Sequence, residues 1–266
     1  MNFAKAYRVH GKIHLDDLDP DDTHGRTREQ AEAVVDKNHE RLFKLQSALY
    51  AENRRALLII LQGMDTSGKD GVIRHVMRGV NPQGCEVHSF KAPSEEERDH
   101  DYLWRIHNAV PARGDIGIFN RSHYEDVLVV RVKDLAPRHV WKKRYDQIND
   151  FESLLRHEGV TVVKFFLHIS KKEQRERLQK RLADPAKNWK FNPNDLSERK
   201  RWDAYMNAYE AALTKTSHKH APWYVIPANK KWFRDLAVSE ILLHTLEKMK
   251  PKFPPAAPGL SRLRVI

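Results

Sequence analysis

The chain has 266 residues and a mass of 31.1 kDa, enough for one large domain or two small ones. Lysine and arginine number 47 against 36 aspartate and glutamate residues, a net charge of +11, and this surplus attracts nucleic acid, anionic membranes or phosphate-rich substrates. The longest clean apolar stretch, residues 56–61, is far shorter than the ~20 residues of a membrane helix. The single cysteine, Cys85, excludes an intrachain disulfide and a cysteine-built metal site. Residues 1–11 lack the apolar core of a signal peptide, so we expect a cytoplasmic protein.

Apolar strand-like runs alternate with helical periodicity along most of the chain. Residues 1–27 are polar and contain an acidic run, and we expect them to form an arm that lies on the domain. Residues 28–250 form the single predicted domain, and the proline-rich residues 251–266 an irregular tail. The predicted strands span residues 56–61, 86–90, 116–119, 161–169 and 223–226. The predicted helices span residues 28–50, 69–80, 94 to about 110, 139–157, 171–182, 197–215 and 232–249. This alternation predicts an α/β protein with an open five-stranded parallel sheet between two helical layers, and ligands on such sheets bind at the carboxyl ends of the strands.

The segment from Gly63 to Asp70 fits the phosphate-loop pattern G-x-x-x-x-G-K. It follows a predicted strand and opens a predicted helix, which is the context that gives this pattern its meaning. The glycines allow the backbone to curl so that consecutive N–H groups point inward, and the lysine adds a full positive charge. The alternative is a chance match in an ordinary strand–turn–helix connection. The predicted phosphate-binding residues here are Gly63, Thr66, Ser67, Gly68, Lys69 and Asp70, followed by Arg74 on the helix.

Two carboxylates distinguish this loop from the usual one. Asp70 stands after the lysine, where a serine or threonine usually helps to hold Mg²⁺, and Asp65 lies inside the loop. A carboxylate beside phosphate is repulsive unless a metal ion lies between them. We therefore expect Asp65 to anchor Mg²⁺, with Asp70 as a second candidate.

A second polar cluster follows the third predicted strand. Asn120 occupies the position where phosphate-transfer proteins usually present an aspartate to the metal. Glu125 and Asp126 could replace that carboxylate or place the acceptor phosphate, and Arg121 could clamp a transferring phosphoryl group. For Asp126 the alternative is a carboxylate stabilised at a helix N-terminus. The candidate nucleotide-binding residues are Lys91, Arg105, Asn120, His123 and Glu125.

Residues 171–200 are rich in lysine and arginine. Arg177 and Arg181 lie four residues apart and therefore share one face of a helix, and Lys190 follows in a turn. We expect a mobile basic lid that closes on an anion and excludes water, and a solvated charged helix is the alternative. The positive charge exceeds what one nucleotide needs, which favours a longer phosphate chain.

These residues resemble the polyphosphate kinase 2 family, and specifically its class III. The resemblance covers about residues 5–255 and rests on the segments 61–71, 118–126, 184–191 and 221–228. It implies a thymidylate-kinase-like P-loop fold with a helical lid. It also implies Mg²⁺-dependent, reversible transfer of phosphoryl groups from inorganic polyphosphate to AMP and ADP, which gives ADP and ATP.

The resemblance also implies roles for individual residues. The implied catalytic residues are Asp65, Lys69, Arg121 and Asp126, and two of these, Asp65 and Asp126, would be metal ligands. We expect a homo-oligomer of two or four copies, and neither nucleic acid nor a membrane as a partner. The rival functions are an ATP-dependent nucleotide kinase on the same fold and a non-enzymatic nucleic-acid binder.

Overall fold

The five predicted strands form one parallel sheet in the computed structural model, which describes residues 2–259 and 264. The order of the strands is β2-β3-β1-β4-β5. Their bounds are β1 Ala56–Gln62, β2 Cys85–Ser89, β3 Ile116–Asn120, β4 Val160–His168 and β5 Trp223–Pro227. Every residue of the central strand β1 is buried, as expected for a strand of a parallel sheet that is covered on both faces. The predicted five-stranded parallel sheet is therefore confirmed.

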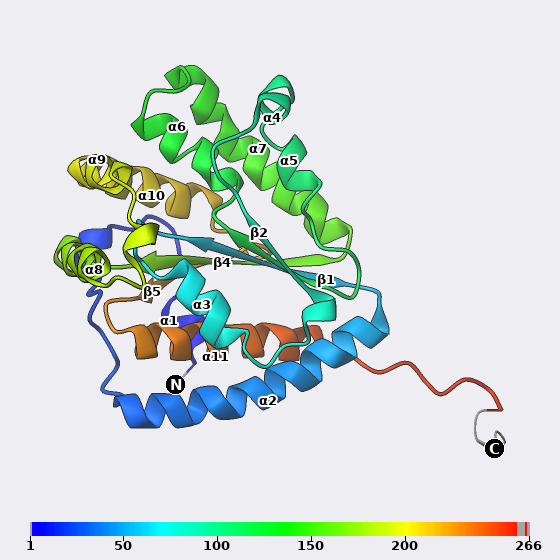
Figure 1. Ribbon diagram of the computed structural model, residues 1–266. Coiled ribbons are helices and arrows are strands. Elements are labelled where there is room, and N and C mark those ends of the chain that lie inside the picture. The colour runs from blue at the N-terminus through cyan, green and yellow to red at the C-terminus, as the bar shows by residue number, and fades with distance from the viewer. Residues whose placement is uncertain (1, 260–263, 265–266) are drawn as a thin grey trace.

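Helices cover both faces of the sheet (Figure 1). The layer below the sheet contains α1 (Phe3–Ala6), α2 (Arg28–Glu52), α3 (Lys69–Val76) and α11 (Lys231–Met249). The layer above it contains α4 (Glu95–Asp99), α5 (Trp104–His107), α6 (Val129–Val132), α7 (Arg138–His157) and α10 (Trp202–Thr216). Helices α8 (Lys171–Ala183) and α9 (Asn194–Lys200) lie at the carboxyl end of the strands. The short 3-10 turns are η1 Leu15–Asp17, η2 Pro82–Gly84, η3 His123–Asp126 and η4 Asn188–Lys190. The predicted three-layer α/β architecture is confirmed.

Two predicted helices are interrupted in the structure. Ser94 caps α4 through the predicted capping box with Glu97, but His100 adopts an extended conformation and ends the helix. Asp101 then accepts a hydrogen bond from the Leu103 amide and starts a new turn before α5, as short acidic side chains do in turns. The predicted helix over residues 197–215 is likewise divided between α9 and α10 at Arg201.

The amino-terminal segment packs along the edge of the sheet. Arg8 forms an antiparallel bridge with Tyr224 of β5, and Phe3, Val9 and Leu15 are buried in the main hydrophobic core. Further along, the Pro20 carbonyl accepts a hydrogen bond from the Asn229 amide. The acidic run of this segment therefore passes the carboxyl end of β5.

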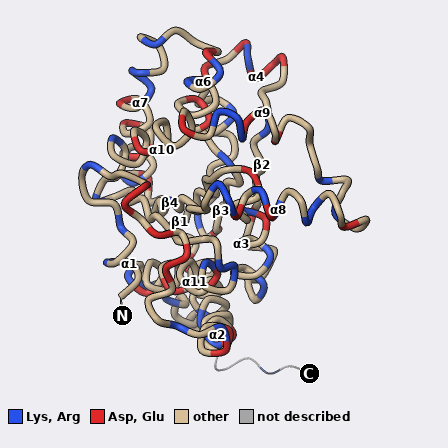
Figure 2. The backbone as a smooth tube through the Cα atoms, turned by 90° about the vertical axis from the view of Figure 1, so that its left-hand side faces the viewer, with Lys and Arg blue, Asp and Glu red and all other residues tan. Residues whose placement is uncertain are grey.

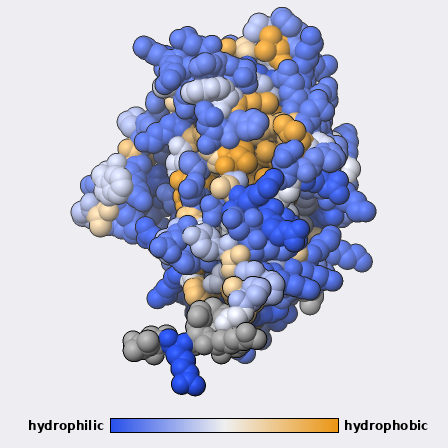
Figure 3. Space-filling model, turned by 90° about the vertical axis from the view of Figure 1, so that its right-hand side faces the viewer, coloured by the Kyte–Doolittle hydropathy of each residue, from blue (hydrophilic) through white to orange (hydrophobic). Residues whose placement is uncertain are grey.

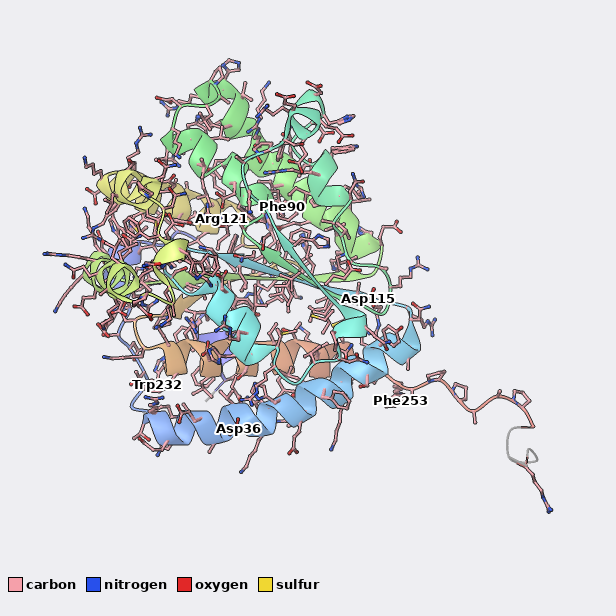
Figure 4. All side chains as sticks on the ribbon, in the orientation of Figure 1. Asp36, Phe90, Asp115, Arg121, Trp232 and Phe253 are labelled. Atoms are coloured by element: carbon pink, nitrogen blue, oxygen red, sulfur yellow. The ribbon has the colours of Figure 1, made fainter. Side chains whose placement is uncertain are left out.

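The two ends of the sheet differ in character. Arg121 lies at the carboxyl end of β3 and Asp115 precedes its amino end (Figure 4). At the amino ends of the strands, a hollow of about 400 Å³ is lined by residues that include Val110, Pro111 and Leu154, and Figure 3 shows apolar side chains gathered on this face. Among the described residues, no helix is both long and apolar enough to span a membrane.

A fully buried polar cluster lies between β4 and the helices above it. The Lys164 ammonium donates to the Glu152 carboxylate, to the Tyr124 hydroxyl at 2.8 Å and to the Thr216 carbonyl at 2.7 Å. Burial lowers the pKa of Lys164 to about 8, and Glu152 opposes this shift. All three ammonium donors are thus satisfied, and the cluster supports η3 from below through Tyr124.

Removing one charge of this cluster is expected to destabilise the fold. Lys164→Met leaves the Glu152 carboxylate buried and unpaired, which costs about 3–5 kcal/mol of the free energy of unfolding. Combining it with Glu152→Gln removes the unpaired charge and should recover a large part of that loss. Urea unfolding of the two variants and the wild type measures both effects. Equal stability of the single variant and the wild type would contradict the assigned pairing.

Candidate active site

The loop after β1 has the curled backbone of a phosphate loop. Gly63 has φ +150° and Gly68 has φ +106°, and a side chain on Gly63 would lie 2.7 Å from the Ser67 hydroxyl and 2.9 Å from the Leu167 carbonyl. Thr66 adopts φ +66°, an uncommon conformation for a residue with a branched side chain. The loop leads into the N-terminus of α3, whose free N–H groups favour an anion.

Lys69 lies inside this curl. Its ammonium donates to the Gly63 carbonyl at 2.7 Å and is buried. Burial, with Arg121 as the second cause, lowers the pKa of Lys69 to about 8, although three neighbouring carboxylates oppose the shift. The lysine is therefore held at the centre of the loop, where an incoming phosphate can take the place of the carbonyl.

Arg121 joins the phosphate loop to the end of β3. It donates to Asp65 at 2.6 Å and to Glu125 at 3.5 Å, and its backbone has φ +63°. Burial lowers the pKa of Arg121, but Glu125 and Asp65 outweigh burial and raise it above its usual value. Asn120 donates to the Asp70 carboxylate at 2.9 Å. The structure thus brings together the predicted site residues Asp65, Lys69, Asp70, Asn120, Arg121 and Glu125.

The charges of this cluster fit a divalent cation. Asp65, Asp70 and Glu125 all lie close enough to Lys69 to raise its pKa. Carboxylates beside a phosphate site repel a polyanion, and a divalent ion between them removes that repulsion. Mg²⁺ needs only one or two carboxylates because it keeps waters and takes phosphate oxygens. Figure 2 shows acidic and basic residues interleaved at this edge of the sheet.

Asp126 faces a different partner from its neighbour Glu125. Its carboxylate accepts a hydrogen bond from Arg144 at 2.9 Å, and burial raises its pKa to about 6. Among the described residues, no group of three or more acidic, histidine or cysteine side chains could hold a metal ion. The two predicted metal ligands have different partners, since Asp65 of the phosphate loop pairs with Arg121 and Asp126 pairs with Arg144.

His123 does not face the site. Its ring is fully buried, and Nε2 lies 3.4 Å from Glu152 in the buried cluster. Burial lowers the pKa of His123, which favours the neutral ring. We therefore correct the predicted nucleotide contact: His123 supports η3 from inside the core.

The Arg177 side chain contacts the phosphate loop and is not free to reach a ligand from a lid. Its side chain is 7% exposed, and all five of its N–H donors have acceptors. These acceptors are Glu173 at 2.7 Å and the carbonyls of Thr66 at 2.9 Å, Ser67 at 3.1 Å, Ala228 at 2.6 Å and Asn229 at 2.9 Å. Arg177 therefore has no donor left for a phosphate, and the predicted phosphate contact is corrected to a positioning role.

No side-chain hydrogen bond joins the other predicted cations to the phosphate loop among the described residues. Arg181 donates weakly to the Lys190 carbonyl and to Asp195, and the Lys190 ammonium lies 5.0 Å from the centre of the Trp189 ring. Arg74 and Lys91 are exposed. Arg105 is buried and donates to the Lys91 carbonyl at 2.9 Å.

Comparison with known proteins identifies the family. The family model for polyphosphate kinase 2 (PPK2) matches residues 25–254. The chain belongs to this family. It is 55% identical over 255 residues to the AMP/ADP-polyphosphate phosphotransferase of Meiothermus ruber, covering 94% of this chain and 95% of that one. It is 50% identical over 232 residues to the ADP-polyphosphate phosphotransferase of Rhodopseudomonas palustris, covering 83% and 80% of the two chains.

A solved structure of the family agrees with the fold. The crystal structure of polyphosphate kinase 2 from Arthrobacter aurescens matches with a TM-score of 0.95 at 45% identity, and the match covers 98% of this chain and 95% of that one. The resemblance to polyphosphate kinase 2 stated from the sequence is therefore confirmed.

Sequence reasoning missed two residues at this edge of the PPK2 fold. Arg144 on α7 holds Asp126, and Gln174 on α8 donates to the Asp65 carbonyl at 3.1 Å. Neither stands in a recognisable pattern, since Arg144 is one of several cations on α7. Only the packing of α7 and α8 against the ends of the strands indicates them.

Arg177→Lys is expected to loosen the phosphate loop. A lysine presents at most three donors from one atom, so at least two of the five acceptors lose their partner. Each unsatisfied buried acceptor costs about 1–3 kcal/mol, and the sum should lower the melting temperature by several degrees. Differential scanning calorimetry measures this shift. Arg181→Lys, one turn along the same helix and more exposed, is the matched control and should melt within about 1 °C of the wild type; equal shifts would contradict the clamp.

Proposed function

We propose that this chain transfers phosphoryl groups from inorganic polyphosphate to AMP and ADP, giving ADP and ATP in a reversible reaction. The observation that carries the proposal is the 55% sequence identity, over 255 residues, to a protein named for that reaction. The cluster of Lys69, Arg121 and Asp65 at the curled loop supports it, because this is machinery for anionic phosphate.

We assign Mg²⁺ to the carboxylate side of this cluster. Asp65 would hold the ion, and Asp70 and Glu125 are near enough to contribute to its field. When bound, the ion neutralises phosphate oxygens and so lowers the repulsion between donor and acceptor. Asp70 is oriented by Asn120, and this pair replaces the serine or threonine that usually follows the lysine.

The residues of the chain then position the donor and acceptor phosphates and neutralise their charge. The terminal phosphate oxygen of AMP or ADP is already anionic, so it attacks the terminal phosphorus of polyphosphate in line without a strong general base. The P–O bond to the rest of the chain breaks, and a polyphosphate shorter by one phosphate leaves. Lys69 and Arg121 stabilise the charge that spreads over the transferring phosphoryl oxygens. Arg177 and Gln174 keep the loop in shape. The catalytic contribution is therefore geometry and electrostatics.

Two further assignments stay predictions from the sequence. They are the homo-oligomer of two or four copies and the cytoplasmic location, which the single cysteine Cys85 suits because thiols stay reduced there. Light scattering of the purified protein tests the first.

Donor choice separates this function from that of an ATP-dependent nucleotide kinase on the same fold. The protein is incubated with Mg²⁺, AMP and either polyphosphate or ATP, and the nucleotides are resolved by chromatography. We expect ADP and then ATP from polyphosphate. Lys69→Ala should lower this transfer about 1,000-fold because a donor to the transition state is lost, while circular dichroism stays unchanged. Lys37→Ala, an exposed position on α2, is the control. Faster transfer from ATP than from polyphosphate would favour the rival kinase.

Lys69 also predicts how binding depends on pH. The ammonium must be charged to hold phosphate, and its pKa in the free protein is about 8. The dissociation constant for polyphosphate should therefore be flat below about pH 8 and rise above it by up to tenfold per pH unit, since binding must then take up a proton. Titration calorimetry between pH 7 and 9.5 measures it. Lys69→Met should bind weakly at every pH without the break, and a constant wild-type affinity to pH 9.5 would refute the role.

A further inference from the structure

A second charged cluster, formed by Tyr102, Arg105, Asp126 and Arg144, follows the phosphate-transfer cluster in the sequence. Glu125 and Asp126 are consecutive in η3 but face opposite partners, since Glu125 lies on Arg121 and Asp126 lies on Arg144. Arg105, which is buried, also acts on the Asp126 carboxylate. Asp126 is thus one residue along the chain from Glu125, which contacts the Arg121 assigned to the transferring phosphoryl.

Tyr102 contributes a buried hydroxyl to this cluster, and that hydroxyl has no hydrogen-bond partner among the described residues. The Arg144 guanidinium lies over the Tyr102 ring, with Cζ 4.6 Å from the ring centre. Burial raises the pKa of Tyr102, Arg144 lowers it and Asp126 raises it, so the hydroxyl lies within range of both charges. A buried hydroxyl without a partner is costly, and a bound ligand at this position would supply the missing partner.

Arg144, which lies over the Tyr102 ring, has N–H donors that the described residues do not use. Both of its hydrogen bonds, to the Asp126 carbonyl and carboxylate, use Nη1. Its Nε and Nη2 edge is not engaged by the described residues, and its side chain is 17% exposed. Asp126 therefore fixes the orientation of the guanidinium while leaving a two-donor edge for an acceptor group.

We propose that Tyr102 and Arg144 bind the phosphate group of the acceptor nucleotide. The proposal deepens the function proposed above and rests on it for the identity of the nucleotide. A phosphate supplies several acceptor oxygens, which match the unpartnered hydroxyl and the open guanidinium edge. Asp126, which holds Arg144, follows Glu125, which contacts Arg121. A phosphate held by Arg144 would therefore direct its oxygen towards the transferring phosphoryl.

Tyr102→Phe is the sharpest test because it deletes only the hydroxyl. Binding of AMP and of adenosine is measured by titration calorimetry without polyphosphate, alongside steady-state kinetics. We expect the dissociation constant for AMP to rise at least about tenfold, as for loss of a hydrogen bond to a charged group, and that for adenosine to stay unchanged. The KM for polyphosphate should also stay unchanged, and the melting temperature of the free protein should stay equal or rise. Arg144→Lys should weaken AMP binding in the same way.

A matched pair on the neighbouring helices serves as the control. Arg131 lies over the Trp141 ring and contacts the Tyr145 hydroxyl at 3.4 Å, so Tyr145→Phe and Arg131→Lys make the same chemical changes elsewhere. They should leave AMP affinity within twofold of the wild type. Unchanged AMP binding by Tyr102→Phe overturns the proposal, and equal weakening of adenosine assigns the hydroxyl to the nucleoside and also overturns it. A wild type that binds AMP in this way but transfers nothing from polyphosphate would refute the proposed function and leave the subsite standing.

Discussion

The curled backbone of the phosphate loop leaves carbonyl groups that the rest of the fold must supply with hydrogen-bond donors. A backbone that turns its N–H groups inward turns its carbonyl groups outward, and here those carbonyls are buried under α8. The Arg177 guanidinium satisfies the carbonyls of Thr66 and Ser67, and its other edge binds the carbonyls after β5. One side chain therefore fastens the loop, the start of α8 and the end of β5 together. Within the predicted lid, α8 is thus anchored to the phosphate loop, and Arg199 of α9 donates to the Lys171 carbonyl and to Gln174 of α8.

The elements that follow from local physics were predictable. The apolar run of β1 and the capping box at Ser94 were visible in the sequence because burial and capping depend on nearby residues. The phosphate loop was predictable because its function requires glycines and a lysine at fixed spacing. Arg177 and Arg181 could not be told apart, since both are helical arginines four residues apart. Only their tertiary environment makes one a buried clamp and the other a partly exposed cation.

The same limit explains the residues that were misplaced or missed in η3. A run of polar residues after a strand indicates a site, but a 3-10 turn sends consecutive side chains in different directions. His123 and Tyr124 enter the core, where the Lys164–Glu152 pair holds them. Glu125 and Asp126 emerge towards different arginines. A turn that is anchored from inside in this way can pair two adjacent carboxylates with two different arginines.

The carboxylates of the site all have partners in the free protein, since Asp70 accepts a hydrogen bond from Asn120 and the others pair with arginines. Asp65 forms an ion pair with Arg121, and Asp126 forms one with Arg144. These pairs offset the repulsion between neighbouring carboxylates before any ligand binds. Backbone strain contributes to this arrangement, because Thr66 and Arg121 both hold positive φ values that cost of order 1 kcal/mol each. That strain carries the chain from β3 directly over the loop and so aims Arg121 at Asp65. In the reaction proposed above, phosphate would replace Asp65 as the partner of Arg121, and the released carboxylate would face the divalent ion assigned to it. The groups that pair with one another in the free protein would thus position and neutralise the two anionic reactants.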